Sequence, residues 1–164
     1  MTIWQKINDF SKNEKKEQII ESIFWSIALP GFSQILNGRL FKGILFLVFE
    51  MVINVKANFN EIIQLSFMGQ IDAAIAQTNF QWLMFYPCLY FFSMWDAYKS
   101  SGGGKSHFSY LPFVFSGFFV TVGIMYSTKL KMFGFLLGPV WLPMLGVIPG
   151  LIIGFSLKRI LTSH

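Results

Sequence analysis

Charged residues, cysteine and histidine are scarce in this chain. Charged residues make up 13% of the 164 positions, about half the roughly 25% of an ordinary soluble domain. The single cysteine, Cys88, cannot form an intramolecular disulfide, and no Cys/His spacing resembles a zinc site. Both histidines, His107 and His164, lie outside the apolar blocks, so neither could activate a serine within them. With no HExxH or GxSxG motif, the sequence argues against an enzyme, a metal site or a bound cofactor.

Apolar and aromatic side chains, by contrast, are abundant. Hydrophobic residues make up 54% of the chain and aromatic residues 18%, including 20 phenylalanines. A soluble fold of this length leaves roughly a third of its unfolded surface in water, so it could not bury so many apolar groups. A lipid bilayer would solvate them. We therefore expect residues 1–164 to form one integral membrane domain of the all-α membrane class.

The net charge of +5 suggests that the chain binds a partner of opposite charge. The lysines and arginines stand in short clusters between apolar blocks, rather than on one basic face with interleaved aromatic residues. Such clusters suit anionic lipid headgroups and set membrane topology, whereas nucleic-acid binding needs a basic patch or stripe. The expected partner is the lipid bilayer and not nucleic acid.

Four apolar blocks are candidates for transmembrane helices, which need about 20 mostly apolar residues each. The third and fourth blocks carry no charge at all, and the fourth is longer than one straight crossing requires. Polar loops separate the blocks. We expect transmembrane helices at residues 40–56, 82–98, 109–128 and 132–157.

Two polar segments are expected to lie outside these spans. Residues 1–21 place Trp4, Ile7 and Phe10 at helical spacing, which favours an amphipathic helix on the cytoplasmic membrane surface. A solvated, frayed N-terminus is the alternative. Residues 57–81 place apolar side chains at every fourth position, which predicts an extracytoplasmic helix that rests on the membrane or caps the bundle. These side chains are Ile63, Phe67, Ile71 and Ile75.

The apolar block at residues 22–38 is short and is interrupted by Pro30–Gly31. Proline lacks an amide donor and glycine tolerates positive φ, so this pair breaks a helix. The block either crosses the membrane as a broken helix or enters it and returns. Return places ten of the thirteen lysines and arginines on the cytoplasmic side, whereas crossing places seven there. The positive-inside rule prefers the first arrangement, so we expect a re-entrant segment, a plasma-membrane location and both termini in the cytoplasm.

The stretch from Leu29 to Leu47 has a distinct motif. Gly38 and Gly43 form a G-x-x-x-x-G pair that leads into an apolar helix, and the polar Gln34 precedes them. This stretch resembles the helical hairpin of the TM-two domain family and related small bacterial membrane proteins, over about residues 22–57. The resemblance implies a hairpin topology and no particular activity.

The same residues make physical sense as a turn at the level of the lipid headgroups. Asn37–Gly38 favours a turn conformation, Arg39 and Lys42 can meet lipid phosphates, and Gly43 lets another helix approach closely. The turn is either a structural hairpin and nothing more, or a contact for a headgroup or a partner. Its candidate residues are Gln34, Asn37, Gly38, Arg39, Lys42 and Gly43.

Glu50 is an acidic residue near the middle of the first expected span. It lies about 14–15 Å into that helix at the usual rise, where an ionised carboxylate costs a few kcal/mol. Helical spacing places Asn54 on the same face as Glu50, so both are expected to point into the bundle. Glu50 either makes a structural hydrogen bond between helices or carries a proton or contacts a polar ligand.

Small residues recur at four-residue spacing in the last two spans, which allows helices to pack backbone against backbone. Proline residues punctuate the last block and should kink or break it, as in a tightly packed tilted helix or a transporter's broken helix. Asp96 is expected to lie at the membrane interface and could pair with Lys99. The expected packing residues are Gly117, Thr121, Gly134, Gly138, Gly146, Gly150 and Gly154.

Two classes of function remain after these exclusions. The first is a membrane-embedded interaction or accessory protein that contacts another membrane protein or a second copy of itself. Its glycine-patterned faces and scarcity of polar groups favour this class. The second is a small transporter or channel subunit that uses Glu50. A pore would need polar residues along one face of several spans, and the sequence offers only Glu50 and Asn54.

Overall fold

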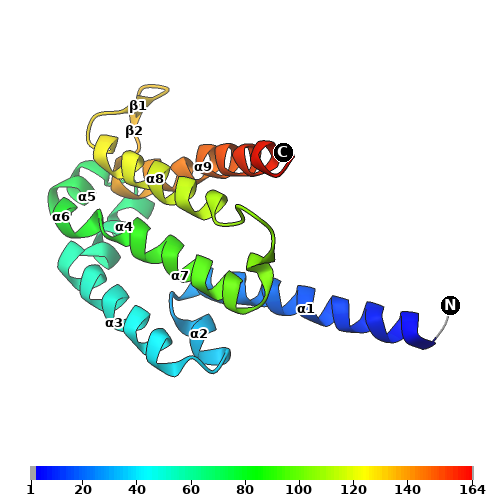
Figure 1. Ribbon diagram of the computed structural model, residues 1–164. Helices are drawn as coiled ribbons and strands as arrows, with labels where there is room; N and C mark the ends of the chain where they lie inside the picture. Colours follow the sequence, from blue (N-terminus) through cyan, green and yellow to red (C-terminus); the bar gives the residue numbers. More distant parts are fainter. Residues whose placement is uncertain (1–2, 164) are drawn as a thin grey trace.

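Helices occupy most of the chain, and this confirms the all-α fold class (Figure 1). The structure is a computed structural model that describes residues 3–163, with side chains from Phe10 onward. Its one sheet is a two-stranded antiparallel hairpin, in which Lys131 pairs with Leu136. The elements are α1 (Ile3–Ala28), α2 (Phe32–Leu36), α3 (Leu40–Ala57), α4 (Phe59–Phe67), α5 (Ile71–Gln77), α6 (Phe80–Leu83), α7 (Tyr86–Ser100), η1 (Gly103–Lys105), α8 (Leu111–Tyr126), β1 (Lys131–Met132), β2 (Phe135–Leu136) and α9 (Gly138–Thr162).

The long helices α3, α7, α8 and α9 run back and forth between two ends of a bundle (Figure 1). At the first end, which we call the α2 end, lie α2, η1 and the C-terminus. At the opposite end, the α4 end, lie α4, α5, α6 and the β1–β2 hairpin. The N-terminal half of α1 extends beyond the α2 end, while its C-terminal half packs against α7.

A sharp reversal separates α1 from α2 at the expected Pro30–Gly31 break. Proline cannot donate the next helical hydrogen bond and disfavours helical φ/ψ at Leu29 before it. Gly31 then adopts φ +96°, a left-handed conformation that glycine enters at little cost. The chain turns back through α2, so the predicted helix break is confirmed.

The helix before this break is longer than expected. The sequence predicts separate segments at residues 1–21 and 22–38, but α1 is one helix of 26 residues, Ile3–Ala28. It contains no glycine or proline, and the good helix former Glu21 stands directly before the expected boundary, so nothing breaks the helix there. The expected apolar stripe includes Trp4 and Ile7, whose side chains lie outside the described residues.

Residues 57–81 contain two helices, α4 and α5, and the start of α6, rather than the single helix expected. Gly69, at φ +76°, ends the first helix by entering a conformation that an α-helix cannot continue. The every-fourth-residue stripe is therefore divided, and Phe67 is 64% exposed. Ile62 and Ala74 are fully buried instead and pack with Val140 of α9. The two helices thus cover the start of α9.

Two of the expected spans, at 82–98 and 132–157, also differ in their limits from the observed helices. The block expected at 132–157 begins as the β1–β2 hairpin, and its helix is α9, Gly138–Thr162. Pro143 and Pro149 lie inside α9 without interrupting it. In the block expected at 82–98, Pro87 lies in the first turn of α7, where a missing amide donor costs least. The chain therefore starts a new helix there, after the short α6.

Two clusters of buried apolar residues lie at the α4 end. One cluster joins Ala57, Leu83 and Ile124, and the second joins Ile62, Ala74 and Val140. Trp141 ties the second cluster to α4, because its Nε1 donates to the Ser66 carbonyl at 3.1 Å. Towards the α2 end, buried polar residues such as Gln34 and Ser93 lie among buried apolar ones such as Met94 and Ala97.

Among residues 3–163, one helix is both long enough and apolar enough to cross a membrane, namely α9. The other three expected spans fall short of this by different margins. α8 is apolar but has 16 residues, and α7 has 15. α3 has 18 residues but carries Lys42, Glu50 and Lys56.

Candidate functional site at the hairpin of α1 and α2

The hairpin tip contacts α3 backbone to backbone. A Cβ atom placed on Gly31 would collide with the Gly43 carbonyl and lie 3.0 Å from the Phe46 Cβ. A Cβ on Gly43 would lie 2.7 Å from the Gly31 carbonyl oxygen. Both positions therefore need glycine for space. The close approach expected at Gly43 is made by the hairpin tip.

Gly38 serves a different purpose, as the turn between α2 and α3. Its φ is +75°, and nothing lies within 4 Å of the place where a Cβ would stand. The Arg39 amide donates to the Gln34 carbonyl at 2.8 Å, and the Gly38 amide to the Ile35 carbonyl at 3.0 Å. This pair of bonds is the Schellman motif, which closes a helix on a left-handed residue.

A cluster of small polar side chains joins the two ends of the hairpin. The hydroxyls of Ser22 in α1 and Ser33 in α2 lie 2.7 Å apart. The Asn37 amide donates to Ser22 at 3.1 Å and to Ser101, at the end of α7, at 3.3 Å. The Ser22 and Ser101 hydroxyls are themselves hydrogen-bonded. Residues 22–37 thus start and finish at the same end of the bundle, whereas a straight helix of 16 residues would separate its ends by about 24 Å.

Gln34 anchors α2 to α7 beneath this cluster. Its side chain is fully buried, and its Nε2 donates to the Ser93 carbonyl at 2.8 Å and to the Asp96 carboxylate at 3.4 Å. Asp96 also accepts from the Lys42 ammonium at 2.8 Å. The expected partner of Asp96 is Lys99, on the same helix; the acid instead faces α3, and Lys42 reaches it there. Three helices therefore meet at one carboxylate.

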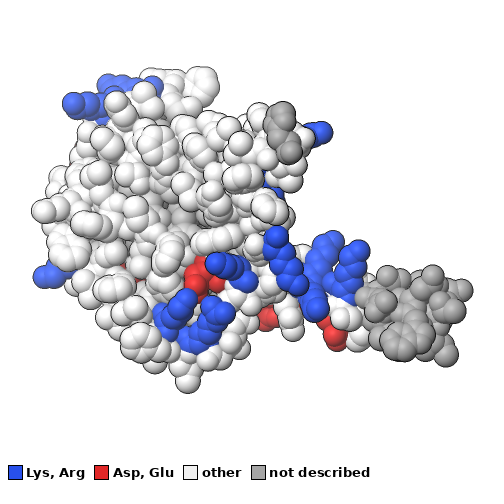
Figure 2. Space-filling view, in the orientation of Figure 1, with Lys and Arg blue, Asp and Glu red and all other residues white. Residues whose placement is uncertain are grey.

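The positive charges divide unevenly between the two ends of the molecule. Figure 2 shows lysine and arginine gathered along α1 and around the α2 end, with a smaller group near the β1–β2 hairpin. Arg39 is exposed in the turn, whereas the ammonium of Lys42 is engaged by Asp96. Of the two cations expected to face lipid phosphates, Arg39 is the one that remains open to such a contact.

Glu50 lies on the packed face of α3, just beyond the hairpin tip. It is half-buried, with Phe46 and Ile53 buried on either side along the helix. Among the side chains of residues 10–163, none donates a hydrogen bond to its carboxylate. It lies within electrostatic range of Tyr86 and Tyr90 of α7, and the Tyr90 hydroxyl donates to the Ile27 carbonyl at 2.9 Å. That carbonyl belongs to the last turn of α1, where the Pro30 break leaves acceptors without helical partners.

Asn54 is half-buried one turn further along α3. Its side chain makes no hydrogen bond among the described residues, and it does not join the polar cluster at the hairpin base. The shared face of Glu50 and Asn54 therefore holds two polar groups that no described neighbour engages. Both remain candidates for binding.

The glycines of α9 pack against α8 at successive turns. A Cβ on Gly146 would lie 2.7 Å from the Phe119 carbonyl oxygen, and one on Gly150 would lie 2.7 Å from the Ser116 nitrogen. Gly154 meets Pro112 in the same manner. α8 and α9 are thereby antiparallel neighbours with almost no space between their backbones.

The other small residues expected in helix packing lie elsewhere. Gly134 is in the β1–β2 turn at φ +85°, with nothing near its Cβ position, so its role is conformational and not packing. Gly138 begins α9 and faces Ile71. Gly117 and Thr121 face away from α9, and the residue that gives α9 room is Gly123, whose Cβ position lies 2.7 Å from the Pro143 Cα.

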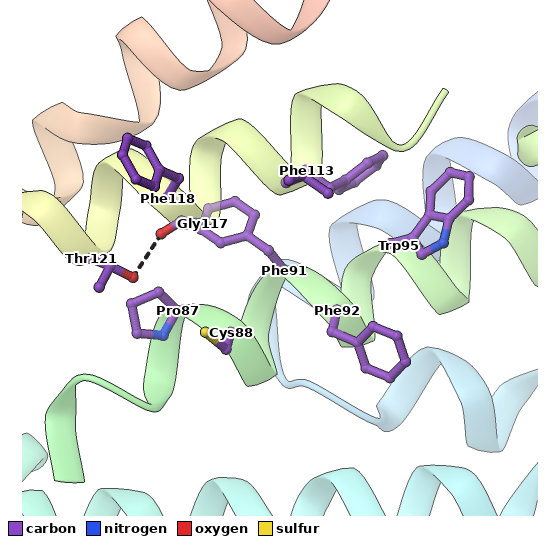
Figure 3. A pocket seen from close by; sticks show the side chains of 10 residues that line it. Pro87, Cys88, Phe91, Phe92, Trp95, Phe113, Gly117, Phe118 and Thr121 are labelled. Atoms are coloured by element: carbon purple, nitrogen blue, oxygen red, sulfur yellow. Dashed lines mark hydrogen bonds between the residues drawn. The ribbon is translucent and has the colours of Figure 1, made fainter. Parts of the chain in front are cut away.

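Gly117 instead forms the floor of an apolar groove between α7 and α8 (Figure 3). The groove has a volume of about 420 Å³. Gly117 leaves room for the Phe91 ring of α7. The Thr121 hydroxyl donates to the Gly117 carbonyl at 2.8 Å, and because this hydroxyl is engaged it adds no polarity to the wall. Its lining residues are Pro87, Cys88, Phe91, Phe92, Trp95, Phe113, Val114, Gly117, Phe118 and Thr121.

Sequence reasoning missed the serines and tyrosines of this region. Ser22, Ser33 and Ser101 look like ordinary helix-end or loop residues, and their partners are 11 to 79 positions away. Tyr86 and Tyr90 look like interfacial aromatic residues. One signal was available, because Ser22, Ser33 and Ser93 are polar positions within or beside otherwise apolar blocks.

Comparison with known proteins adds no relative: no family model matches this chain, and neither a curated protein nor a solved structure matches it.

Proposed function

We propose that this chain is a multi-pass membrane protein in which α3, α7, α8 and α9 cross the bilayer and the α1–α2 hairpin enters it and returns. The outward faces of these helices support the proposal, because large apolar side chains on them are exposed. Examples are Phe41 at 81%, Val55 at 71%, Phe118 at 59% and Phe155 at 57%. A soluble monomer rarely exposes apolar patches of this extent. The gathering of positive charge at the α2 end supports a cytoplasmic location for that end.

Within the membrane, we propose that the protein acts by contact with another membrane protein or with a second copy of itself. The buried Gln34 amide donates to the Ser93 carbonyl and to the partly buried Asp96 carboxylate, so this donor is engaged within the protein and not offered to a solute. The groove between α7 and α8 opens on the apolar surface, and its wall is almost entirely apolar. Close packing against small residues is the usual basis of helix association in lipid.

A first experiment tests the membrane location alone. The full chain, expressed with a tag, is fractionated and its membranes are washed at alkaline pH, which removes peripheral proteins. The proposal expects the chain to stay in the membrane pellet and to need detergent for extraction. Recovery as a folded monomer in the aqueous fraction would refute it.

A second experiment tests the interaction. A photo-crosslinking amino acid replaces Phe118 in the groove, and a matched control carries it in place of Val55, on the outer face of α3. Irradiation of intact membranes should give an adduct of defined protein mass at position 118 and lipid adducts at position 55. Lipid adducts alone at both positions would contradict the proposed interaction.

Glu50 supports a second candidate, a small transporter or channel subunit. Its carboxylate has no hydrogen-bond donor among the described side chains and lies close to the broken end of α1. In transporters, the ends of broken helices near the membrane midplane form substrate and ion sites. Ion flux into proteoliposomes should then fall for Glu50→Gln and stay unchanged for Glu61→Gln, an exposed acid at the start of α4. Equal flux from both variants and the parent would remove this candidate.

A further inference from the structure

A polar cavity of about 420 Å³ lies between α1, the end of α2 and the end of α7. Its wall includes the hydroxyls of Ser22 and Ser101, the amide of Asn37 and the carboxylate of Glu21. It adjoins the hydrogen-bonded base of the hairpin. Unlike the apolar groove between α7 and α8, this hollow presents polar groups to a ligand.

The charge inside this cavity differs from the charge around it. Glu21 is the one charged residue among its described lining residues, and no lysine or arginine contributes to the wall. Glu21 accepts a hydrogen bond from the Trp25 indole at 3.2 Å, which leaves its second oxygen free for a cation. The Trp25 ring beside it can also attract a cation through its π face. A ligand with an amine therefore fits, and a purely anionic one does not.

Apolar side chains border the same cavity. Trp25 is 42% exposed and Leu36 is 54% exposed, and both line it. Trp25 lies one helical turn beyond Glu21 towards the hairpin tip, and hence deeper in the proposed membrane. The hollow thus joins a polar part at headgroup level to an apolar part along the hairpin, a combination that suits an amphiphile.

We propose that this cavity holds the headgroup of a zwitterionic phospholipid with a primary amine, of the phosphatidylethanolamine type. Its ammonium pairs with Glu21, and its acyl chains lie along Trp25 and Leu36. Its phosphate accepts a hydrogen bond from the Gln18 amide, which lines the cavity one turn before Glu21. The assignment rests on the membrane location in the proposed function. A quaternary choline headgroup cannot donate hydrogen bonds to Glu21, and a glycerol headgroup carries no cation, so both bind less well.

The test is native mass spectrometry of the full chain, released from membranes that contain ethanolamine, choline and glycerol phospholipids in equal amounts. We expect one retained lipid, mainly of the ethanolamine class. Glu21→Gln should reduce this retention about tenfold, because a charge-assisted hydrogen bond contributes about 1.5 kcal/mol or more. Glu14→Gln, which removes an exposed acid from the same helix outside the cavity, should retain the lipid as the parent does.

Two further arms sharpen the result. Glu21→Lys should shift retention towards the anionic glycerol phospholipid, which a merely structural role of Glu21 would not do. Water-soluble glycerophosphoethanolamine should not displace the lipid, since it lacks the chains that contact Trp25 and Leu36. Equal retention of the three lipids, an unchanged Glu21→Gln variant or displacement by the soluble compound would each overturn the inference. Recovery of the chain outside membranes would instead overturn the proposed function.

Discussion

The molecule contains two helical hairpins, α1–α2 and α8–α9, and they are stabilised in opposite ways. In α8–α9 the backbones touch through Gly123, Gly146 and Gly150. In α1–α2 the two arms meet at their base through the hydroxyls of Ser22 and Ser33 and the amide of Asn37. The first hairpin depends on the absence of side chains, and the second depends on polar side chains that find distant partners.

The difference follows from what each hairpin contacts. α8 and α9 are long, so successive turns of one can pack along the other, and dispersion contacts accumulate over the whole length. α2 has five residues and can bury little apolar area. Its position therefore depends on hydrogen bonds to α1 and α7, and above all on the buried Gln34.

The largest effect is expected from enlarging a glycine in α8–α9. Gly150→Leu places a side chain where the Ser116 backbone already lies, so the helices must separate and lose their contacts. We expect a loss of at least about 3 kcal/mol in the free energy of unfolding, measured by denaturant titration in mixed micelles. Ser156→Leu, on an exposed face of α9, is the control and should change stability little. Equal losses from both variants would contradict the packing described for α8–α9.

The second-largest effect distinguishes two costs within α1–α2. One is the cost of a side chain on a left-handed backbone, and the other is the cost of a steric collision. Gly31 and Gly38 both have positive φ, but only Gly31 has neighbours at its Cβ position. Gly38→Ala should cost about 1 kcal/mol from conformation alone, whereas Gly31→Ala adds the collision with Gly43 and should cost about 2–4 kcal/mol. Thermal unfolding of the two variants in the same detergent measures the difference. Equal costs would mean that the tip does not contact α3.

A smaller effect is expected at the hairpin base. Gln34→Leu keeps the volume of the side chain but removes the donor to Ser93 and Asp96. We expect a loss of about 1–2 kcal/mol together with faster proteolysis near residues 29–39. Gln64→Leu, on the exposed face of α4, provides the comparison. A Gln34→Leu variant as stable and as resistant as the parent would show that α2 is held by apolar packing instead.

The smallest effect concerns the ion pair between Lys42 and Asp96. Lys42 is half exposed, and exposed pairs couple by about 1 kcal/mol or less. A double-mutant cycle with Lys42→Met and Asp96→Asn should give a coupling of this size. The same cycle with Lys99→Met should give none, because the Asp96 carboxylate faces α3 rather than Lys99. Coupling to Lys99 and not to Lys42 would reverse the assignment.

The sequence predicts the α8–α9 hairpin better than the α1–α2 hairpin, for a physical reason. Spacing of small residues is a local pattern, so the packing role of Gly146, Gly150 and Gly154 can be recognised from the sequence alone. The sequence does not reveal which α8 residues these glycines contact. The partners include Ser116 and Phe119, and it is their backbones rather than their side chains that meet α9. The packing role predicted for Gly134 is wrong, since its spacing from Gly138 matches that pattern by coincidence.

For the α1–α2 hairpin, the sequence predicts the helix break but not the contacts. The break can be recognised because Pro30–Gly31 acts locally; the return to the cytoplasmic side, predicted from the distribution of charge, stays a prediction. The pairing of Gln34 with Ser93 and of Lys42 with Asp96 joins residues more than 50 positions apart, which no local pattern reports. The predicted segment limits differ from the observed helices at α1 and at α4–α5, because no glycine or proline separates Glu21 from Ser22 and because Gly69 ends α4.

The most direct test of the account asks on which side of the membrane each end of the hairpin lies. Cys88→Ser removes the single cysteine, and Lys15→Cys, Arg39→Cys, Lys56→Cys and Lys131→Cys then place one thiol at a time on that background. A membrane-impermeant maleimide should label positions 15 and 39 from the cytoplasmic side and positions 56 and 131 from the other side. Labelling of positions 15 and 39 from opposite sides would contradict the account.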